Sequence, residues 1–296
     1  MRSGTTHERT TAMSFTRTQL AGAVAAAGLM LPAAAFAATI NGGPGSERLR
    51  GTNVTDTING NGGNDRIRGL AGDDALNGGT GNDRVFGNAG NDRLAGVQGN
   101  DWLNGGAGDD TVTGDANAVG DVTSFDRIFG ASGNDTLRGG DSMDRIYGGT
   151  GNDTSLGENG HDRMAGGAGN DGQDGGAGND TIFANRGVDV SVGGDGNDVL
   201  WALARADVSG PGDTVGDTLD GGNGNDVLRT RDGEADRITC GAGDDRALLD
   251  TVDVIADATP DNINGSCETV QRKAPKAGEA RSEDAQEKPA AERVAS

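Results

Sequence analysis

The sequence predicts an all-β protein, a parallel β-roll in which two nine-residue units form each coil and a disulfide pins a C-terminal cap. Three observations predict this fold. The chain repeats with a period of nine from Gly42 to Leu248, glycine contributes 55 of 296 residues while aromatic residues make up only 3%, and one large apolar residue recurs at a fixed place in each unit. Such a chain has too few large apolar side chains for an ordinary core, whereas stacked repeats bury a continuous core one coil at a time.

The repeat is visible when the chain is cut at every ninth residue from Gly42. Successive units read GGPGSERLR, GTNVTDTIN, GNGGNDRIR, GLAGDDALN and GGTGNDRVF, and the register resumes at Gly130 after an interruption. Glycine is frequent at positions one, two and four, asparagine at five, aspartate at six and a large apolar residue at eight. A low-complexity polymer that stays disordered is the alternative, but such a sequence has no reason to keep position eight in phase.

The last three positions of each unit predict a short strand. In RIR, ALN and RVF, an apolar side chain is flanked by residues that point the other way, which is the period-two pattern of a strand. Three residues of strand and a six-residue turn reverse the chain, so two units complete a coil and successive coils stack as two parallel sheets. The side chains expected to point inward include Ile67, Leu76, Val85, Leu94, Leu103 and Val112.

The turn positions predict a cation site. Glycine permits positive φ and close approach of neighbouring coils, and asparagine at position five tolerates the same backbone angles. The aspartate at position six has no turn role that asparagine or serine could not fill. Stacking would align these aspartates in a row of like charges, which is destabilising without a cation. The predicted ligands are Asp56, Asp65, Asp74, Asp83, Asp92, Asp101, Asp110, Asp135, Asp144, Asp153, Asp162, Asp171, Asp180, Asp198, Asp226 and Asp245.

Carboxylate and carbonyl oxygens favour Ca²⁺ over the smaller Mg²⁺, which demands tighter octahedral geometry. Zinc would require His or Cys ligands, and we expect His161, at the variable fifth position, to be a solvated turn residue. The repeat resembles the calcium-binding nonapeptide repeat of the RTX proteins, written G-G-x-G-x-D-x-U-x, where U is a large apolar residue. The resemblance implies a roll that binds multiple Ca²⁺ ions and folds with them.

The N-terminal segment, residues 1–37, has the layout of a secretory signal peptide. Arg17 precedes the apolar run LAGAVAAAGLMLPAAAFA, with a cut expected after Ala37 and Met13 as an alternative start. A membrane anchor is the alternative, but the apolar stretch is short and no second one follows. The two cysteines, Cys240 and Cys267, are expected to form one disulfide in an exported protein, with two free thiols as the alternative.

The remaining chain divides into a roll at 38–248, a cap at 249–271 and a disordered charged tail at 272–296. Insertions near 114–129 and 202–220 are expected to be surface loops, with partner binding as the alternative. At position eight, Ser155, Gln173 and Ser191 replace the apolar residue in three consecutive coils of one sheet. This part of the sheet could be locally unstable, or it could form a groove for a ligand. The register could also be shifted so that Leu156 and Val192 are buried instead, and the shift is favoured for two of the three units.

A formal net charge of −21 makes nucleic acid an unexpected partner. No nucleophile elbow, HExxH or phosphate loop is present, so we expect no enzyme. In the RTX family such repeats often accompany a protease, lipase, epimerase or toxin domain, and none is recognised here. The prediction is a secreted calcium-binding protein with a structural or adhesive role and an unknown cell-surface or matrix partner. Ice binding is one alternative, although position three lacks a flat threonine array, and an accessory module for a separate exported enzyme is another.

Overall fold

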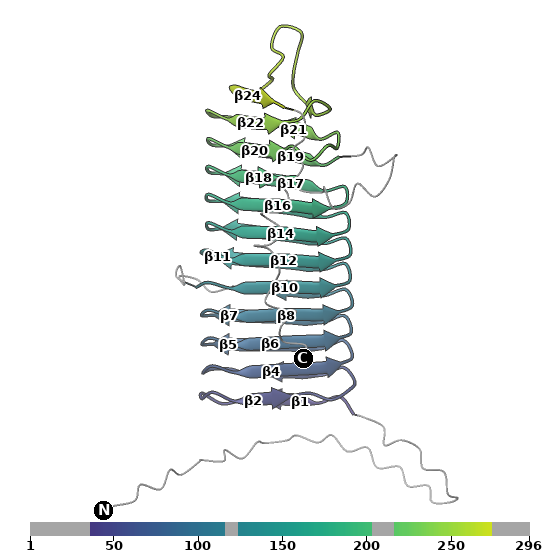
Figure 1. The fold of residues 1–296 in the computed structure, drawn as a ribbon. Coiled ribbons are helices and arrows are strands. Elements are labelled where there is room, and N and C mark those ends of the chain that lie inside the picture. Colours follow the sequence, from purple (N-terminus) through teal and green to yellow (C-terminus); the bar gives the residue numbers. More distant parts are fainter. Residues whose placement is uncertain (1–35, 116–123, 203–215, 274–296) are drawn as a thin grey trace, which may run out of the picture.

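The structure is a computed structural model that describes residues 36–115, 124–202 and 216–273. All regular elements of these residues are strands, arranged in two parallel 12-stranded sheets. Figure 1 shows the coils stacked into a single column, with odd-numbered strands on one sheet and even-numbered strands on the other. In this part of the chain, no helix is long and apolar enough to cross a membrane.

The strand limits follow the repeat. The first sheet contains β1 (Thr39–Asn41), β3 (Thr57–Asn59), β5 (Ala75–Thr80), β7 (Arg93–Gln98), β9 (Thr111–Thr113), β11 (Thr136–Asp141), β13 (Thr154–Asn159), β15 (Gly172–Ala177), β17 (Val190–Asp195), β19 (Thr218–Asn223), β21 (Arg237–Thr239) and β23 (Val254–Ile255). The second sheet contains β2 (Arg48–Arg50), β4 (Arg66–Ala71), β6 (Arg84–Ala89), β8 (Trp102–Ala107), β10 (Arg127–Ser132), β12 (Arg145–Thr150), β14 (Arg163–Ala168), β16 (Thr181–Arg186), β18 (Val199–Trp201), β20 (Val227–Thr230), β22 (Arg246–Leu249) and β24 (Thr269–Arg272).

The strand register confirms two units per coil. Ile67 pairs with Val85 and Leu76 pairs with Leu94, each partner lying one coil further along the chain. At the two insertions the same pairing continues with sequence separations of 25 and 28 residues instead of 18. The insertions therefore leave the stacking of the coils intact. Residues 116–123 and 203–215, which carry most of the inserted sequence, lie outside the described residues.

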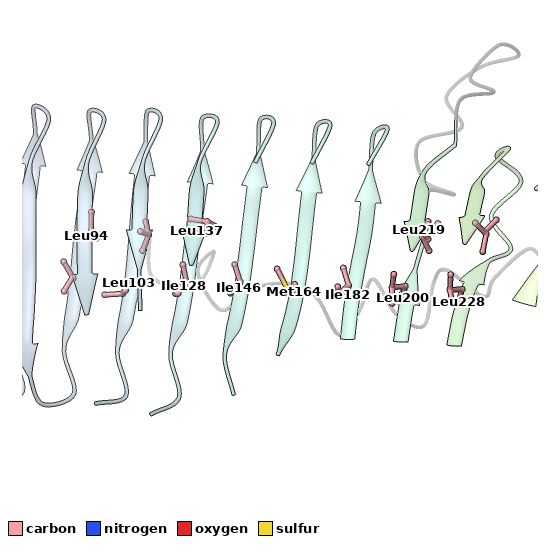
Figure 2. Close-up of a cluster of buried hydrophobic side chains, with 14 of the residues drawn as sticks. Leu94, Leu103, Ile128, Leu137, Ile146, Met164, Ile182, Leu200, Leu219 and Leu228 are labelled. Carbon is pink, nitrogen blue, oxygen red and sulfur yellow. The ribbon is translucent and has the colours of Figure 1, made fainter. Parts of the chain in front are cut away.

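The core is the column of position-eight side chains between the two sheets, as predicted. Ile67, Val85, Leu103 and Val112 are fully buried, and Leu76 and Leu94 are nearly so. Figure 2 shows the central part of this column, where one apolar side chain follows another from coil to coil. Because the partners lie in register about 4.8 Å apart, each side chain packs on its counterparts in the adjacent coils.

The strands are longer than the predicted three residues. In most coils they run for six residues, from position seven through position three of the next unit. The glycine-rich positions carry no period-two apolar pattern, yet their backbone still pairs with the neighbouring coil. Leu70, with φ of 102°, and Gly79, with φ of 105°, both lie inside strands, so the ladder continues through a residue with positive φ.

The expectation that the register shifts to bury Leu156 and Val192 is wrong. Ser155, Gln173 and Ser191 point inward and are 3% exposed or less, while Leu156 and Val192 are only half-buried on the outer face. A shift by one residue would turn every side chain of the coil to the opposite face. It would therefore expel the aspartate at position six, whose hydrogen bonds to the adjacent coils fix the register.

The C-terminal end contains the predicted disulfide between Cys240 and Cys267, whose Cα atoms lie 5.1 Å apart. Both cysteines belong to the buried core. Strands β23 and β24 extend both sheets past Leu248, so the segment expected as a cap forms a last coil of shorter strands. β24 reaches Arg272, the first residue of the segment expected as a tail, and residues 274–296 lie outside the described residues.

Candidate metal-binding turns

The aspartates at position six form two columns, one in the turns before each sheet. All of them are 5% exposed or less. The first aspartate row, before the first sheet, contains Asp56, Asp74, Asp92, Asp110, Asp135, Asp153, Asp171, Asp189, Asp217, Asp236 and Asp253. The second aspartate row contains Asp65, Asp83, Asp101, Asp126, Asp144, Asp162, Asp180, Asp198, Asp226 and Asp245.

One carboxylate oxygen of each aspartate ties its coil to the preceding coil. The backbone N–H of Asp74 donates to Oδ1 of Asp92 at 2.8 Å, and that of Asp65 donates to Oδ1 of Asp83 at 2.7 Å. The second row ends on a glutamate, where the N–H of Asp245 donates to Oε2 of Glu268 at 2.8 Å. Each row is thus a continuous chain of hydrogen bonds along the axis of the roll.

The other carboxylate oxygen is buried without a hydrogen-bond partner in most members of both rows. A buried anionic oxygen with no partner is costly, which points to a ligand that the protein atoms do not provide. These orphan Oδ2 atoms, within the described residues, belong to Asp65, Asp74, Asp83, Asp92, Asp101, Asp110, Asp135, Asp144, Asp153, Asp162, Asp171, Asp180, Asp189, Asp198, Asp217, Asp226, Asp236 and Asp245.

A glycine at position one makes room beside most of the orphan oxygens. A Cβ atom at Gly69 would overlap Oδ2 of Asp74 and lie 2.9 Å from the carbonyl oxygen of Gly87 in the next coil. The same arrangement recurs at Gly78, between Oδ2 of Asp83 and the carbonyl oxygen of Gly96. No three His, Cys, Asp or Glu side chains of the described ranges form a metal-binding group by themselves. The oxygens beside Oδ2 are backbone carbonyls, which together with a carboxylate form the donor set that Ca²⁺ prefers.

Burial makes these carboxylates hard to ionise in the metal-free protein. It raises the pKa of Asp83 to about 6, against the lowering effect of the hydrogen bond from Asp65. Deeper burial, together with the charges of Asp126 and other aspartates, raises the pKa of Asp101 to about 9, although the N–H of Asp83 lowers it. Both rows therefore hold carboxylates that favour either a proton or a cation over an isolated negative charge.

A second ladder of hydrogen bonds runs through position five. Oδ1 of Asn64 accepts from the N–H of Asn82 at 2.8 Å, and Oδ1 of Asn82 accepts from the N–H of Asn100 at 2.9 Å. The sequence predicts only a turn role for these asparagines, whereas in the structure they also link neighbouring coils. His161 is exposed, as expected, and replaces an asparagine of the ladder, because its Nδ1 accepts from the N–H of Asn179 at 2.6 Å.

All of the predicted ligands lie in the two aspartate rows, but the prediction omitted five members. Asp126 and Asp217 follow the insertions and Asp189 stands at position six of ANRGVDVSV, so the period of nine was sufficient to find them. The hydrogen bonds that place Asp236 and Asp253 in the first row span 19 and 17 residues instead of 18. A search that allowed one residue more or less per turn would have found both.

The C-terminal end of the first row differs from the rest. Asp232, Glu234 and Asp250 are buried there beside Asp236 and Asp253. Asp253 accepts hydrogen bonds from the hydroxyl of Thr230 and the N–H of Asp250, both at 2.7 Å. These carboxylates replace the glycine-rich turn of the regular units, and burial together with neighbouring carboxylates raises the pKa of Asp236 to about 10.

The repeats that form both aspartate rows match a known family model. The model of the RTX calcium-binding nonapeptide repeat matches residues 41–74, 50–85, 86–118, 123–155, 156–172, 174–200 and 211–247. Among solved structures, the chain is similar to a hyperactive, Ca²⁺-dependent, β-helical antifreeze protein from an Antarctic bacterium. The identity is 19% over 76% of this chain and 92% of that chain, with a TM-score of 0.31. No curated protein sequence matches the chain.

Proposed function

The chain belongs to the RTX calcium-binding nonapeptide repeat family, and we propose that it is a secreted protein that folds by binding multiple Ca²⁺ ions between its stacked turns. One observation carries the proposal. In most members of both aspartate rows, a buried carboxylate oxygen with no hydrogen-bond partner among the described residues lies beside a glycine and faces a carbonyl oxygen of the next coil. A cation at that place would join two coils through oxygens of both.

The electrostatics of the rows support a divalent cation. Aspartates one coil apart raise one another's pKa; the charges of Asp56 and Asp92, for example, add to the effect of burial at Asp74. Ionising all of them without a counter-ion would leave two columns of buried like charges. When Ca²⁺ is bound, it supplies the compensating charge, and its binding free energy becomes folding free energy.

The choice of Ca²⁺ over Mg²⁺ rests on the donor set. Backbone carbonyls and monodentate carboxylates in glycine-rich turns suit the larger and less regular coordination of Ca²⁺, whereas Mg²⁺ demands near-octahedral geometry and keeps its waters. The test is far-UV circular dichroism of the chelator-treated protein during titration with each ion. A cooperative gain of β-structure in Ca²⁺ alone supports the proposal, and full β-structure in chelator at neutral pH contradicts it.

Two adjacent aspartates offer a matched pair of variants. Oδ1 of Asp74, at position six, accepts from the N–H of Asp56, and Oδ1 of Asp73, at position five, accepts from the N–H of Asn91. Asparagine preserves both hydrogen bonds and removes the same charge. Asp74→Asn should lower the affinity for Ca²⁺ about tenfold and remove one ion from the stoichiometry, whereas Asp73→Asn should change neither. Equal effects in calorimetric titrations would assign the affinity to net charge instead of the buried row.

Secretion is the second part of the proposal. It is supported by the buried disulfide Cys240–Cys267, since such bonds persist in oxidising compartments, and by the signal-peptide pattern of residues 1–37. Mass spectrometry of the protein from culture medium should show an N-terminus at Ala38. Recovery only inside cells, with the N-terminal residues retained, would contradict this part.

A structural or adhesive role outside the cell completes the proposal. The alternative of ice binding would need a regular array on one face. The outer face of the first sheet has threonine at position seven in Thr111, Thr136 and Thr154, but Arg93 precedes this run and Gly172 follows it. So short a run supports the structural role, and clear thermal hysteresis of the calcium-loaded protein would overturn that ranking.

A further inference from the structure

The outer face of the second sheet has a column of arginines. Position seven of neighbouring strands brings Arg48 opposite Arg66 and Arg66 opposite Arg84, and the column continues after Trp102. We call this column the arginine ladder; its members are Arg48, Arg66, Arg84, Arg127, Arg145 and Arg163. Six strand spacings of about 4.8 Å separate its ends, so the ladder is about 29 Å long.

Within the described residues, no carboxylate forms an ion pair with a member of the arginine ladder. The ion pair between Arg138 and Glu158, at 3.0 Å, lies on the first sheet. The pKa of Arg66 is lowered by the charge of Arg68 above all, then by burial and by the charges of Arg48 and Arg84. The ladder is therefore a line of mutually repelling cations on a protein whose net charge is −21.

Aromatic rings hold several of the guanidinium groups in place. Arg127 and Arg145 lie over the ring of Phe125 at 4.5 and 5.2 Å, and Arg163 lies over that of Phe183 at 4.4 Å. A guanidinium stacked on a ring by its flat face keeps its N–H edge available for bidentate hydrogen bonds to a carboxylate or sulfate. These ring contacts thus order part of the ladder without satisfying the guanidinium donors.

The first sheet has no such column. Threonine occupies position seven in half of its strands, and arginine occurs there only at Arg93 and Arg237 within the described strands. Only one of the two outer faces therefore concentrates positive charge. A general preference for arginine at position seven would have populated both faces.

We propose that the arginine ladder binds a linear anionic polysaccharide, whose regularly spaced carboxylate or sulfate groups pair with successive arginines. The charge of the unpaired ladder and its straight course along the axis match an extended polyanion. Arginine forms charge-assisted, bidentate hydrogen bonds to such groups. The proposal requires the folded roll, but not a particular ion to fold it.

The aromatic geometry favours a polysaccharide over single-stranded nucleic acid. Nucleic-acid-binding surfaces offer free ring faces on which bases stack. Here Phe129 lies between Trp102 and Tyr147, with centroids 5.0 and 5.1 Å away, and Phe183 lies between Arg163 and Trp201. Phe129 and Phe183 are only 4% exposed, so their faces are already covered.

The test compares two triple variants that remove the same charge. Arg84→Gln, Arg127→Gln and Arg145→Gln neutralise the ladder, whereas Arg93→Gln, Arg138→Gln and Arg237→Gln neutralise the first sheet. Binding of the full chain to fluorescent hyaluronan and chondroitin sulfate is measured, with dextran as the uncharged control and oligo-dT as the nucleic acid. Circular dichroism in the same buffer establishes that each protein is folded.

We expect the ladder variant to bind the anionic glycans at least tenfold more weakly, and the first-sheet variant to remain within twofold of the wild type. Glycan binding by the wild type should weaken with salt. Absence of glycan binding by the folded protein, equal losses in both variants, or tighter binding of oligo-dT would overturn the proposal. So would concentration-dependent self-association that only the ladder variant abolishes, since the ladder would then bind a second copy. If the wild-type protein lacks β-structure in Ca²⁺, that result counts against the proposal of calcium-dependent folding and not against the arginine ladder.

Discussion

The polar segment of the core should be a place where substitution stabilises the roll. Ser155, Gln173 and Ser191 follow one another on β13, β15 and β17, where the other coils have apolar side chains. Oγ of Ser191 donates to Oε1 of Gln173 at 3.2 Å, but Nε2 of Gln173 and Oγ of Ser155 have no hydrogen-bond partner among the described residues. Gln173→Leu combined with Ser191→Ala removes the unsatisfied amide together with the one hydrogen bond that it makes.

The expected gain is about 2 kcal/mol in the free energy of unfolding. A buried donor without a partner costs about 1–3 kcal/mol and a lost hydrogen bond about 0.5–1.5 kcal/mol, and the new apolar burial adds to the difference. Leucine fits this column, since Leu137 pairs with Ser155 and Leu219 pairs with Ser191. The reciprocal variant, Leu219→Gln, should destabilise the roll by a similar amount.

The assay is urea denaturation in saturating Ca²⁺, followed by far-UV circular dichroism. The double variant should unfold at higher urea than the wild type, and Leu219→Gln at lower urea. A lower midpoint for the double variant would refute the reasoning, because it would show that the amide has a partner that the apolar side chains cannot replace. An unchanged midpoint for both variants would show that the interior does not discriminate polar from apolar residues.

Three further predictions concern the turns and the cap. Burial raises the pKa of Asp83 to about 6 and of Asp144 to about 9, from the ordinary value of 3.8. The metal-free roll should therefore lose stability as the pH rises from about 4, and the loss should be complete at about pH 6 for Asp83 and about pH 9 for Asp144. Ca²⁺ affinity should rise over the same range, and titrations in chelator and in Ca²⁺ that showed no pH dependence would contradict this. Gly87→Ala should weaken Ca²⁺ binding about tenfold, measured by calorimetry, because its Cβ would overlap Oδ2 of Asp92. Gly45→Ala is the control and should leave Ca²⁺ binding unchanged, because its Cβ would meet nothing within 4 Å. The disulfide joins residues 27 apart, so reducing it should lower the free energy of unfolding, measured in urea titrations, by about 3.5 kcal/mol. Equal midpoints with and without reductant would show that packing, and not the disulfide, stabilises the cap.

The repeat made most of the fold and both aspartate rows predictable. Position eight identified the core, and position six identified sixteen residues that all lie in the rows, because each coil repeats the same contacts. The nine-residue period could not predict the places where the structure departs from the regular repeat. The extra length of the strands depends on backbone pairing through glycines, and the turns before Asp236 and Asp253 each change by one residue.

The polar segment was misjudged for a different reason. Considered alone, the unit GGTGNDTSL gains by burying Leu156 in place of Ser155. In the roll, the same unit also holds Asp153, whose Oδ1 accepts from Asp135 and whose N–H donates to Asp171. Shifting one coil would break contacts to two others, so the stack sets the register and the unit tolerates a polar core.

The arginine ladder is not visible in the sequence for a related reason. Its members stand in alternate units and become neighbours only when every second unit is aligned.

The two carboxylate oxygens of each aspartate explain why the coils should fold together instead of one at a time. Oδ1 of Asp92 reaches back to the N–H of Asp74, while its Oδ2 lies beside Gly87 and near the carbonyl oxygen of Gly105 in the following coil. A cation at Oδ2 therefore stabilises the interface with the following coil, while Oδ1 fixes the register with the preceding coil, so each aspartate couples the two interfaces of its own coil. Since repeat proteins gain stability chiefly from interfaces between neighbours, filling one site favours the next. The cooperativity of the calcium titration should accordingly fall when a central aspartate such as Asp92 is replaced, and much less when Asp56, in the second coil, is replaced.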